Sequence, residues 1–242
     1  MVREGKIRMM LTSGQSLRRL GLASELQGSP RLSIVTECGS GRDVLDALEF
    51  HWREQEPDVL LVDGNLPDMT LSGLLHAIRA MRCDEQRGAG FGCLRILIIL
   101  EEETPEDVMA LLASGTHGLC SNHVSPQALV EAVHHIHEGG LWFDADAAAY
   151  VQEALSAPLA FIGDKRPVCP GLVLTARERE VLGLMIEGMN NRQIAAQLSL
   201  SVHTIKAEVS HILRKMSATD RVEAVVKAIR GDLLSESPSR PA

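Results

Sequence analysis

A repeated alternation of short apolar segments and amphipathic segments constrains the first part of this chain more than any other feature. Buried strands are expected at residues 7–11, 32–38, 58–63, 94–100 and 118–121. Each is followed by a helix-like segment, at residues 16–26, 42–55, 71–81, 105–113 and 126–138. This alternation predicts a doubly wound α/β domain, in which helices cover both faces of a five-stranded parallel sheet.

From Leu174 onward the apolar residues recur with helical spacing only. Thr175 and Glu178 have capping-box spacing and begin the first of four predicted helices. The third, residues 201–216, buries a stripe made of Val202, Ile205, Val209, Ile212 and Met216.

A second face of this third helix carries hydrogen-bond donors and small side chains, namely His203, Lys206, Ala207, Ser210 and Arg214. A helix that enters the major groove needs such a face, and a tight turn before it makes a helix-turn-helix. Every amphipathic helix has a polar face, so a solvated surface is the alternative interpretation.

Net charge differs between the two parts. The whole chain has a net charge of −8. Residues 1–167 hold 14 Lys+Arg and 24 Asp+Glu, a net of −10, whereas residues 168–242 hold 10 and 8, a net of +2. The acidic balance therefore does not argue against nucleic-acid binding by the second part.

Several function classes find no support in the sequence. No apolar run approaches the ~18 residues of a membrane helix, and residues 1–14 lack an export signal, so we expect a cytoplasmic protein without a membrane partner. The motifs GxSxG, HExxH, GxGxxG and the P-loop are absent, and we expect no enzyme activity. His134 and His137 share a helical face, but no matching pair of Cys or acidic residues lies nearby in sequence, so we predict no metal site and no cofactor.

Residues 174–226, which include LTAREREVL, NRQIA, LSVHTIK and VSHILRKM, resemble the LuxR/NarL-type DNA-binding domain. The resemblance implies double-stranded DNA as a partner and the third helix as the DNA reader. The predicted DNA-binding residues are Arg192, Ser201, His203, Thr204, Lys206, Ala207, Ser210 and Arg214. The last helix of that family often supplies a dimer contact, which corresponds here to Val222, Glu223, Val226 and Ile229.

Residues 6–138 resemble the flavodoxin-like receiver domains of two-component response regulators. The best anchor is PDVLLVDGNLPDMTLSGLL, residues 57–75. In that family the aspartate at the end of this strand accepts a phosphoryl group, and Asp63 stands there. Receivers also hold Mg²⁺ with an acidic pair after the first strand, where this chain has Ser13 and Gly14. Each lost carboxylate removes an attraction of about 4 kcal/mol before desolvation, so we predict no bound Mg²⁺.

Two further residues of receiver chemistry are replaced. A hydroxyl residue normally follows the fourth strand, where Leu100 or Glu101 stands, and the run Glu101–Glu103 would repel a phosphoryl group if it faced the site. A lysine normally follows the fifth strand, where Asn122 stands. With so little positive charge, we expect the receiver to act without phosphorylation.

The predicted layout is a receiver-like domain at 6–138, a linker at 139–172 compatible with a short helix over 144–156, a DNA-binding domain at 173–234 and a disordered tail at 235–242. We predict a homodimeric transcription regulator that takes its signal from a protein or small molecule at the receiver. Two alternatives stay open: a conventional response regulator phosphorylated on Asp63, and a protein-binding adaptor.

Overall fold

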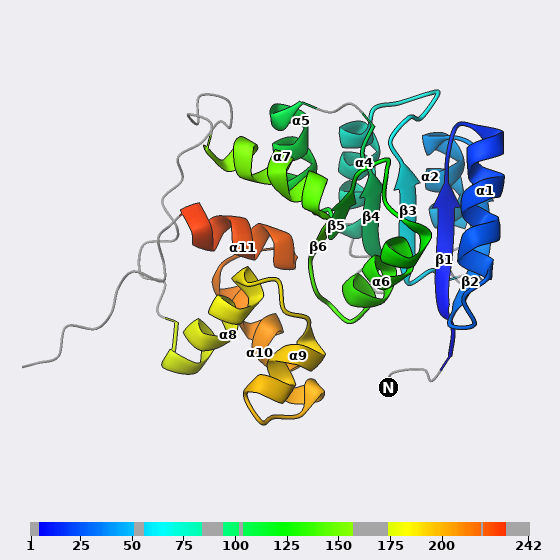
Figure 1. Cartoon of the computed structure of the whole chain (residues 1–242). Coiled ribbons are helices and arrows are strands. Elements are labelled where there is room, and N and C mark those ends of the chain that lie inside the picture. Colours follow the sequence, from blue (N-terminus) through cyan, green and yellow to red (C-terminus); the bar gives the residue numbers. More distant parts are fainter. Residues whose placement is uncertain are drawn as a thin grey trace, which may run out of the picture. The chain divides into compact units, whose positions relative to one another are not determined.

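The computed structural model describes residues 5–50, 56–83, 94–101, 104–156, 174–218 and 220–230 (Figure 1). The chain divides into two compact units. Residues 1–137 and 142–157 form the first, and residues 138–141 and 158–242 form the second. A Gly-rich polar loop is predicted at 82–93, and its residues 84–93 lie outside the described residues, as do the predicted linker after residue 156 and the predicted tail.

The first unit is a parallel sheet with strand order β2-β1-β3-β4-β5-β6. Its strands are β1 Ile7–Thr12, β2 Leu32–Cys38, β3 Val59–Asp63, β4 Arg95–Ile99, β5 Gly118–Cys120 and β6 Trp142–Phe143. Its helices are α1 Ser16–Gln27, α2 Gly41–Phe50, α4 Leu71–Cys83, α5 Pro105–Ala113, α6 Pro126–His137 and α7 Ala145–Ser156. The predicted doubly wound α/β class is confirmed.

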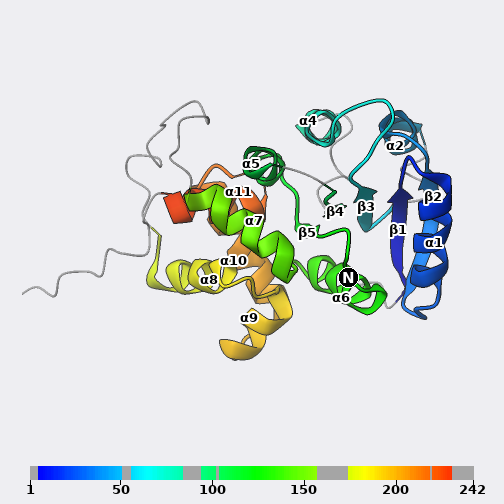
Figure 2. The ribbon, with the colours of Figure 1, turned by 45° about the horizontal axis from the view of Figure 1, so that its top comes forward.

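Helices cover both faces of this sheet, which explains the continuous apolar runs Val59–Val62 in β3 and Ile96–Ile99 in β4. Side chains of α1 and α6 pack with Met9, Leu61 and Leu97 in one core cluster. Figure 2 shows α2 and α4 on the side of the sheet opposite α6. Every residue of β3 is buried, including Asp63 at its carboxyl end.

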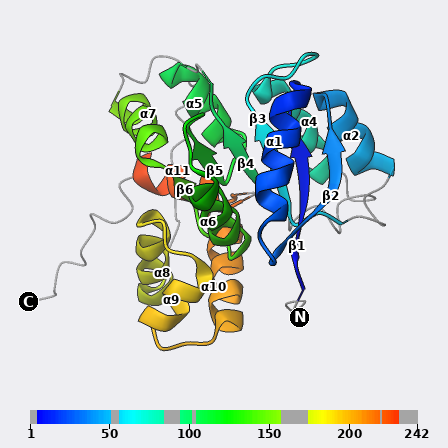
Figure 3. The same cartoon turned by 45° about the vertical axis from the view of Figure 1, so that its right-hand side comes forward.

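The sheet of the described residues contains six strands, one more than predicted. The extra strand, β6, pairs with β5, and α7 follows it and packs beside α5 (Figure 3). Asp144 explains how a two-residue strand is held: its carboxylate accepts hydrogen bonds from Ser121 N at 2.7 Å and from Ala147 N at 2.8 Å. Residues 142–156, predicted as linker, thus group with the first unit. The other predicted domain limits stay predictions.

The second unit contains α8 Ala176–Ile186, α9 Asn191–Gln197, α10 Val202–Lys215 and α11 Arg221–Arg230. The predicted capping box begins α8, because Thr175 Oγ1 accepts a hydrogen bond from Glu178 N while Glu178 accepts one from Thr175 N. Ser201 caps α10. Of the predicted stripe, Ile205, Ile212 and Met216 are buried, whereas Val202 and Val209 are half-buried.

Glu178 also connects α8 to α10, the helix predicted to read DNA. Its carboxylate is 4% exposed and accepts a hydrogen bond from Lys215 Nζ at 2.7 Å. Burial alone would raise the pKa of this carboxyl, but the hydrogen bonds from Lys215 and Thr175 outweigh it and hold the pKa below its ordinary value. The charged form therefore stabilises the packing of α10 on α8.

We predict that Glu178→Gln destabilises the second unit by about 1–2 kcal/mol at neutral pH, because Lys215 loses its charged acceptor at a partly exposed site. A carboxyl with a lowered pKa contributes stability above its ordinary pKa and loses it as the pH falls through the lowered value, so the difference should shrink in acid. Hydrogen-exchange protection of α8 and α10 measures it. The control is Glu180→Gln on the exposed side of α8, which should change protection little. Equal protection in Glu178→Gln and wild type would contradict the assignment.

Candidate nucleic-acid interface and receiver site

The polar face of α10 is exposed along its length. The side chains of His203, Lys206, Ala207, Ser210 and Arg214 are all accessible, and Ile205 and Ile212 are buried on the opposite side. Lysine, arginine and histidine donate hydrogen bonds to phosphates and base edges, and a small residue lets the helix approach the groove closely. The structure therefore brings these predicted residues together on one surface.

The side chain of Ser201 caps the N-terminal end of α10. Ser201 Oγ accepts a hydrogen bond from Thr204 N at 3.0 Å and lies 2.8 Å from Thr204 Oγ1. The turn from α9 is tight, with Ser199 at φ 53°. Arg192 is the second residue of α9, and its side chain is 73% exposed. It pairs at 2.8 Å with Glu138, which groups with this unit.

The predicted dimer contact on α11 is only partly accessible. Val222 is 1% exposed and belongs to the core, so it offers no surface for a partner. Glu223 is half-buried and pairs with Lys227 at 2.8 Å. Val226 is half-buried and Ile229 is 46% exposed. Of the four predicted dimer residues, Val222 is therefore excluded, while Glu223, Val226 and Ile229 keep accessible surface and stay predictions.

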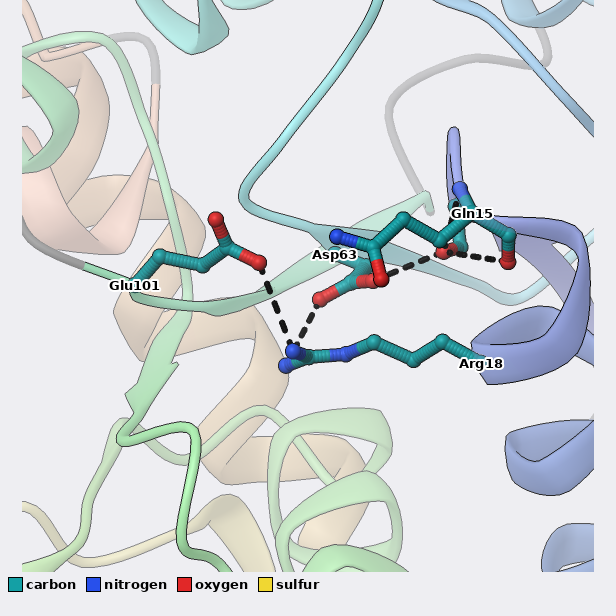
Figure 4. Close-up of polar contacts among 5 residues, drawn as sticks. Gln15, Arg18, Asp63 and Glu101 are labelled. Carbon is teal, nitrogen blue, oxygen red and sulfur yellow. Dashed lines mark hydrogen bonds and ion pairs between the residues drawn. The ribbon is translucent and has the colours of Figure 1, made fainter.

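At the receiver site, Asp63 is almost completely buried and is held by two side chains (Figure 4). Ser13 Oγ donates a hydrogen bond to Asp63 Oδ2 at 2.7 Å. Arg18 Nη2 lies 2.9 Å from Asp63 Oδ1, and Arg18 Nη1 lies 3.3 Å from Glu101 Oε1. Oδ1 accepts no well-aligned hydrogen bond from the described residues, so its contact with Arg18 is that of an ion pair.

The backbone around Gly14 excludes an acidic residue there. A Cβ atom at this position would lie 2.7 Å from the carbonyl oxygen of Asn65 and 2.9 Å from Cδ of Pro67. Both distances are shorter than real Cβ contacts, so any side chain at position 14 requires the loop after β3 to move. The packing of this loop therefore leaves no room for the second residue of an acidic pair.

A magnesium ion does not fit these residues. The acidic pair is missing, and both oxygens of Asp63 are engaged by a hydroxyl and a guanidinium. Within the ranges that the structure describes, no group of three or more His, Cys, Asp or Glu residues is placed to hold a metal. At the position where receivers bind a metal ion, this fold places a carboxylate, Asp63, whose charge is compensated by Arg18.

The sequence left open whether Glu101 faces this site, and in the structure Glu101 does so, paired with Arg18. Sequence reasoning missed Arg18, although an arginine five residues after Ser13 on the first helix was the signal to seek. Leu100 is buried and Asn122 is exposed. Glu102 and Glu103 lie outside the described residues.

Residues 172–228 match the sequence model of the family described as bacterial regulatory proteins, luxR family. The transcriptional regulatory protein DegU of Brevibacillus brevis is 28% identical over 241 residues, which cover 95% of each chain. The uncharacterized transcriptional regulatory protein YxjL of Bacillus subtilis is 30% identical over 230 residues, which cover 95% of this chain and 98% of YxjL. The chain belongs to the LuxR family of bacterial regulatory proteins.

A solved structure of the Salmonella typhimurium response regulator RcsB covers 93% of this chain and 99% of its own, with a TM-score of 0.53 and 18% identity. The likeness confirms the fold, a receiver-like unit with a helix-turn-helix unit. This LuxR-family chain is a DNA-binding response regulator, and its relatives are transcriptional regulators. Among the described residues, no helix is long and apolar enough to cross a membrane.

We predict that Lys206→Ala weakens binding of this LuxR-family regulator to its operator by about 1–3 kcal/mol, or roughly 5- to 150-fold, because a base contact is lost. The operator is selected from genomic DNA, and affinity is then measured by anisotropy titration at fixed salt. Lys6→Ala removes the same charge from an exposed position of the first unit and serves as the control. Unchanged affinity of Lys206→Ala would exclude Lys206 as a reader.

Proposed function

We propose that this protein is a cytoplasmic, homodimeric transcription regulator that binds double-stranded DNA sequence-specifically and acts without phosphorylation of Asp63. The observation that carries the last part is the engagement of both Asp63 oxygens, one by Ser13 and one by Arg18. The signal then reaches the receiver through a protein or small molecule.

The α10 face supports the DNA-binding half of this proposal. Two α10 units related by a two-fold axis would read half-sites about one helical turn apart. RcsB, which has a similar fold, has been solved as two dimers bound to two parallel DNAs. The positive net charge of residues 168–242 fits the same role, because phosphate contacts supply much of the affinity for DNA.

Phosphorylation of Asp63 is opposed on three physical grounds. Its nucleophilic oxygens are buried and already engaged. The acidic pair with which receivers hold Mg²⁺ is replaced by Ser13 and Gly14, so no bound metal ion neutralises charge on a transferring phosphoryl group. Asn122 replaces the lysine that pairs with the phosphoryl group in receivers, and a ligand shifts an equilibrium only by its differential interaction with the two states. Even phosphorylated, Asp63 would bias the conformation weakly.

We predict that acetyl phosphate or phosphoramidate with Mg²⁺ leaves the intact mass and the operator affinity of the full chain unchanged. Mass spectrometry and DNA titration of wild type and Asp63→Asn measure both quantities. A stoichiometric phosphoryl adduct that tightens DNA binding, and is lost in Asp63→Asn, would contradict the proposal. That result would restore the conventional two-component interpretation.

We predict that Val226→Glu and Ile229→Glu on α11 weaken dimer formation on DNA more than they weaken folding. A charge placed in an apolar interface is desolvated without a partner, which is strongly unfavourable. Ile229 is exposed, so Ile229→Glu should leave the fold of the unit intact. Sedimentation of the protein–DNA complex gives its stoichiometry. Normal dimerisation of both variants on DNA would remove α11 from the interface.

A further inference from the structure

We propose that Arg18 is the permanent cation of the receiver site, standing in for a divalent metal ion. The inference deepens the proposed function, because it names what holds the site closed without metal or phosphoryl group. The guanidinium contacts two carboxylates from different parts of the fold: Asp63 at the end of β3 and Glu101 just after β4 (Figure 4).

The charges at this site require a cation. Asp63 is 1% exposed, and a buried carboxylate is strongly unfavourable unless an opposite charge or hydrogen bonds compensate it. Ser13 supplies one hydrogen bond but no charge. Glu101, at 27% side-chain exposure, adds a second negative charge around the same guanidinium. Without Arg18 the two carboxylates would face each other uncompensated.

Arginine suits this role better than a metal ion in one respect. A guanidinium stays protonated at all physiological pH values, and its separate nitrogens reach two acceptors at once. Here Nη2 approaches Asp63 and Nη1 approaches Glu101. Because the cation is covalently part of the chain, the site does not depend on metal concentration.

The first turns of α1 are shaped to deliver this side chain. Arg19, the next residue, donates a hydrogen bond to the carbonyl oxygen of Ser13 at 2.6 Å and so fixes the loop between β1 and α1. Gly14 lets the loop after β3 close over it. Arg18 then extends from an anchored helix end to Asp63. The Arg18 side chain thus joins α1 to the end of β3 and to Glu101, two residues after the end of β4.

This role of Arg18 predicts that wild type and Arg18→Ala differ in how they respond to a divalent cation. In wild type a divalent cation gains nothing, because Arg18 already compensates both acids. In Arg18→Ala, Asp63, Glu101 and Ser13 present oxygen ligands without a counter-ion, which is the donor chemistry that Mg²⁺ prefers. Removing the arginine should therefore create a requirement for a divalent cation.

The test uses thermal unfolding of the full chain with and without millimolar Mg²⁺ at constant ionic strength. Both tryptophans, Trp52 and Trp142, precede residue 157 in the sequence, so their fluorescence reports on the first unit. We expect no Mg²⁺ effect on the melting temperature of wild type. Arg18→Ala should melt lower and recover by roughly 2–8 °C when Mg²⁺ is added.

Three further variants separate charge compensation from packing. Arg18→Lys keeps a cation and should stay insensitive to Mg²⁺. Arg18→Ala combined with Asp63→Asn removes both charges, and should melt above Arg18→Ala and show little Mg²⁺ response. Arg19→Ala is the matched control on the same helix, expected to lower the melting temperature without a Mg²⁺ response. If Arg18→Ala alone does not fold, the folding of the double variant still supports the inference.

Two results would overturn the inference. The first is a wild-type melting temperature that rises with Mg²⁺ and loses this rise in Asp63→Asn, since the metal would then enter beside Arg18. The second is a double variant that is no more stable than Arg18→Ala. Neither readout involves DNA or a phosphodonor. A failure here is therefore distinct from a failure of phosphorylation independence, which the mass measurement reports.

Discussion

The need to compensate a buried carboxylate organises the whole receiver site. Asp63 ends β3, a strand whose residues are all buried, where water cannot solvate its charge. The contacts around it are arranged to meet this need: a hydroxyl from the end of β1 and a guanidinium from α1. Because Arg18 also binds Glu101, compensation of one charge connects the carboxyl ends of neighbouring strands. A site satisfied in this way has little use for a metal ion or a phosphoryl group.

Parallel strand order makes this convergence possible. β1, β3 and β4 are adjacent, so residues that follow them meet at one edge of the sheet. Gly14 then allows the loop after β3 to approach within a distance that a side chain would block. The opposite end of the strand order is extended by β6 and α7, and Asp144 ties their start to Ser121 at the end of β5. The contacts of Arg18 with Asp63 and of Asp144 with Ser121 thus hold segments that the periodicity of the sequence does not predict.

In the helix-turn-helix unit, helix caps and one partly buried ion pair orient α10. Glu178 contributes to both, since it closes the capping box of α8 and accepts a hydrogen bond from Lys215 of α10. With Ile205, Ile212 and Met216 buried, α10 leaves one face for DNA. That face is available because the opposite one is needed for the core.

The sequence by itself determined the fold class, the four C-terminal helices with the polar face of the third, and the place of Asp63, because each depends on local periodicity or a dense motif. It missed β6, since two residues carry no periodic signal, and it placed Val222 on a dimer surface although the residue is buried. Only the tertiary structure decided what surrounds Asp63. Arg18 and Glu101 are 83 residues apart in the chain, and long-range packing alone brings them to the same carboxylate.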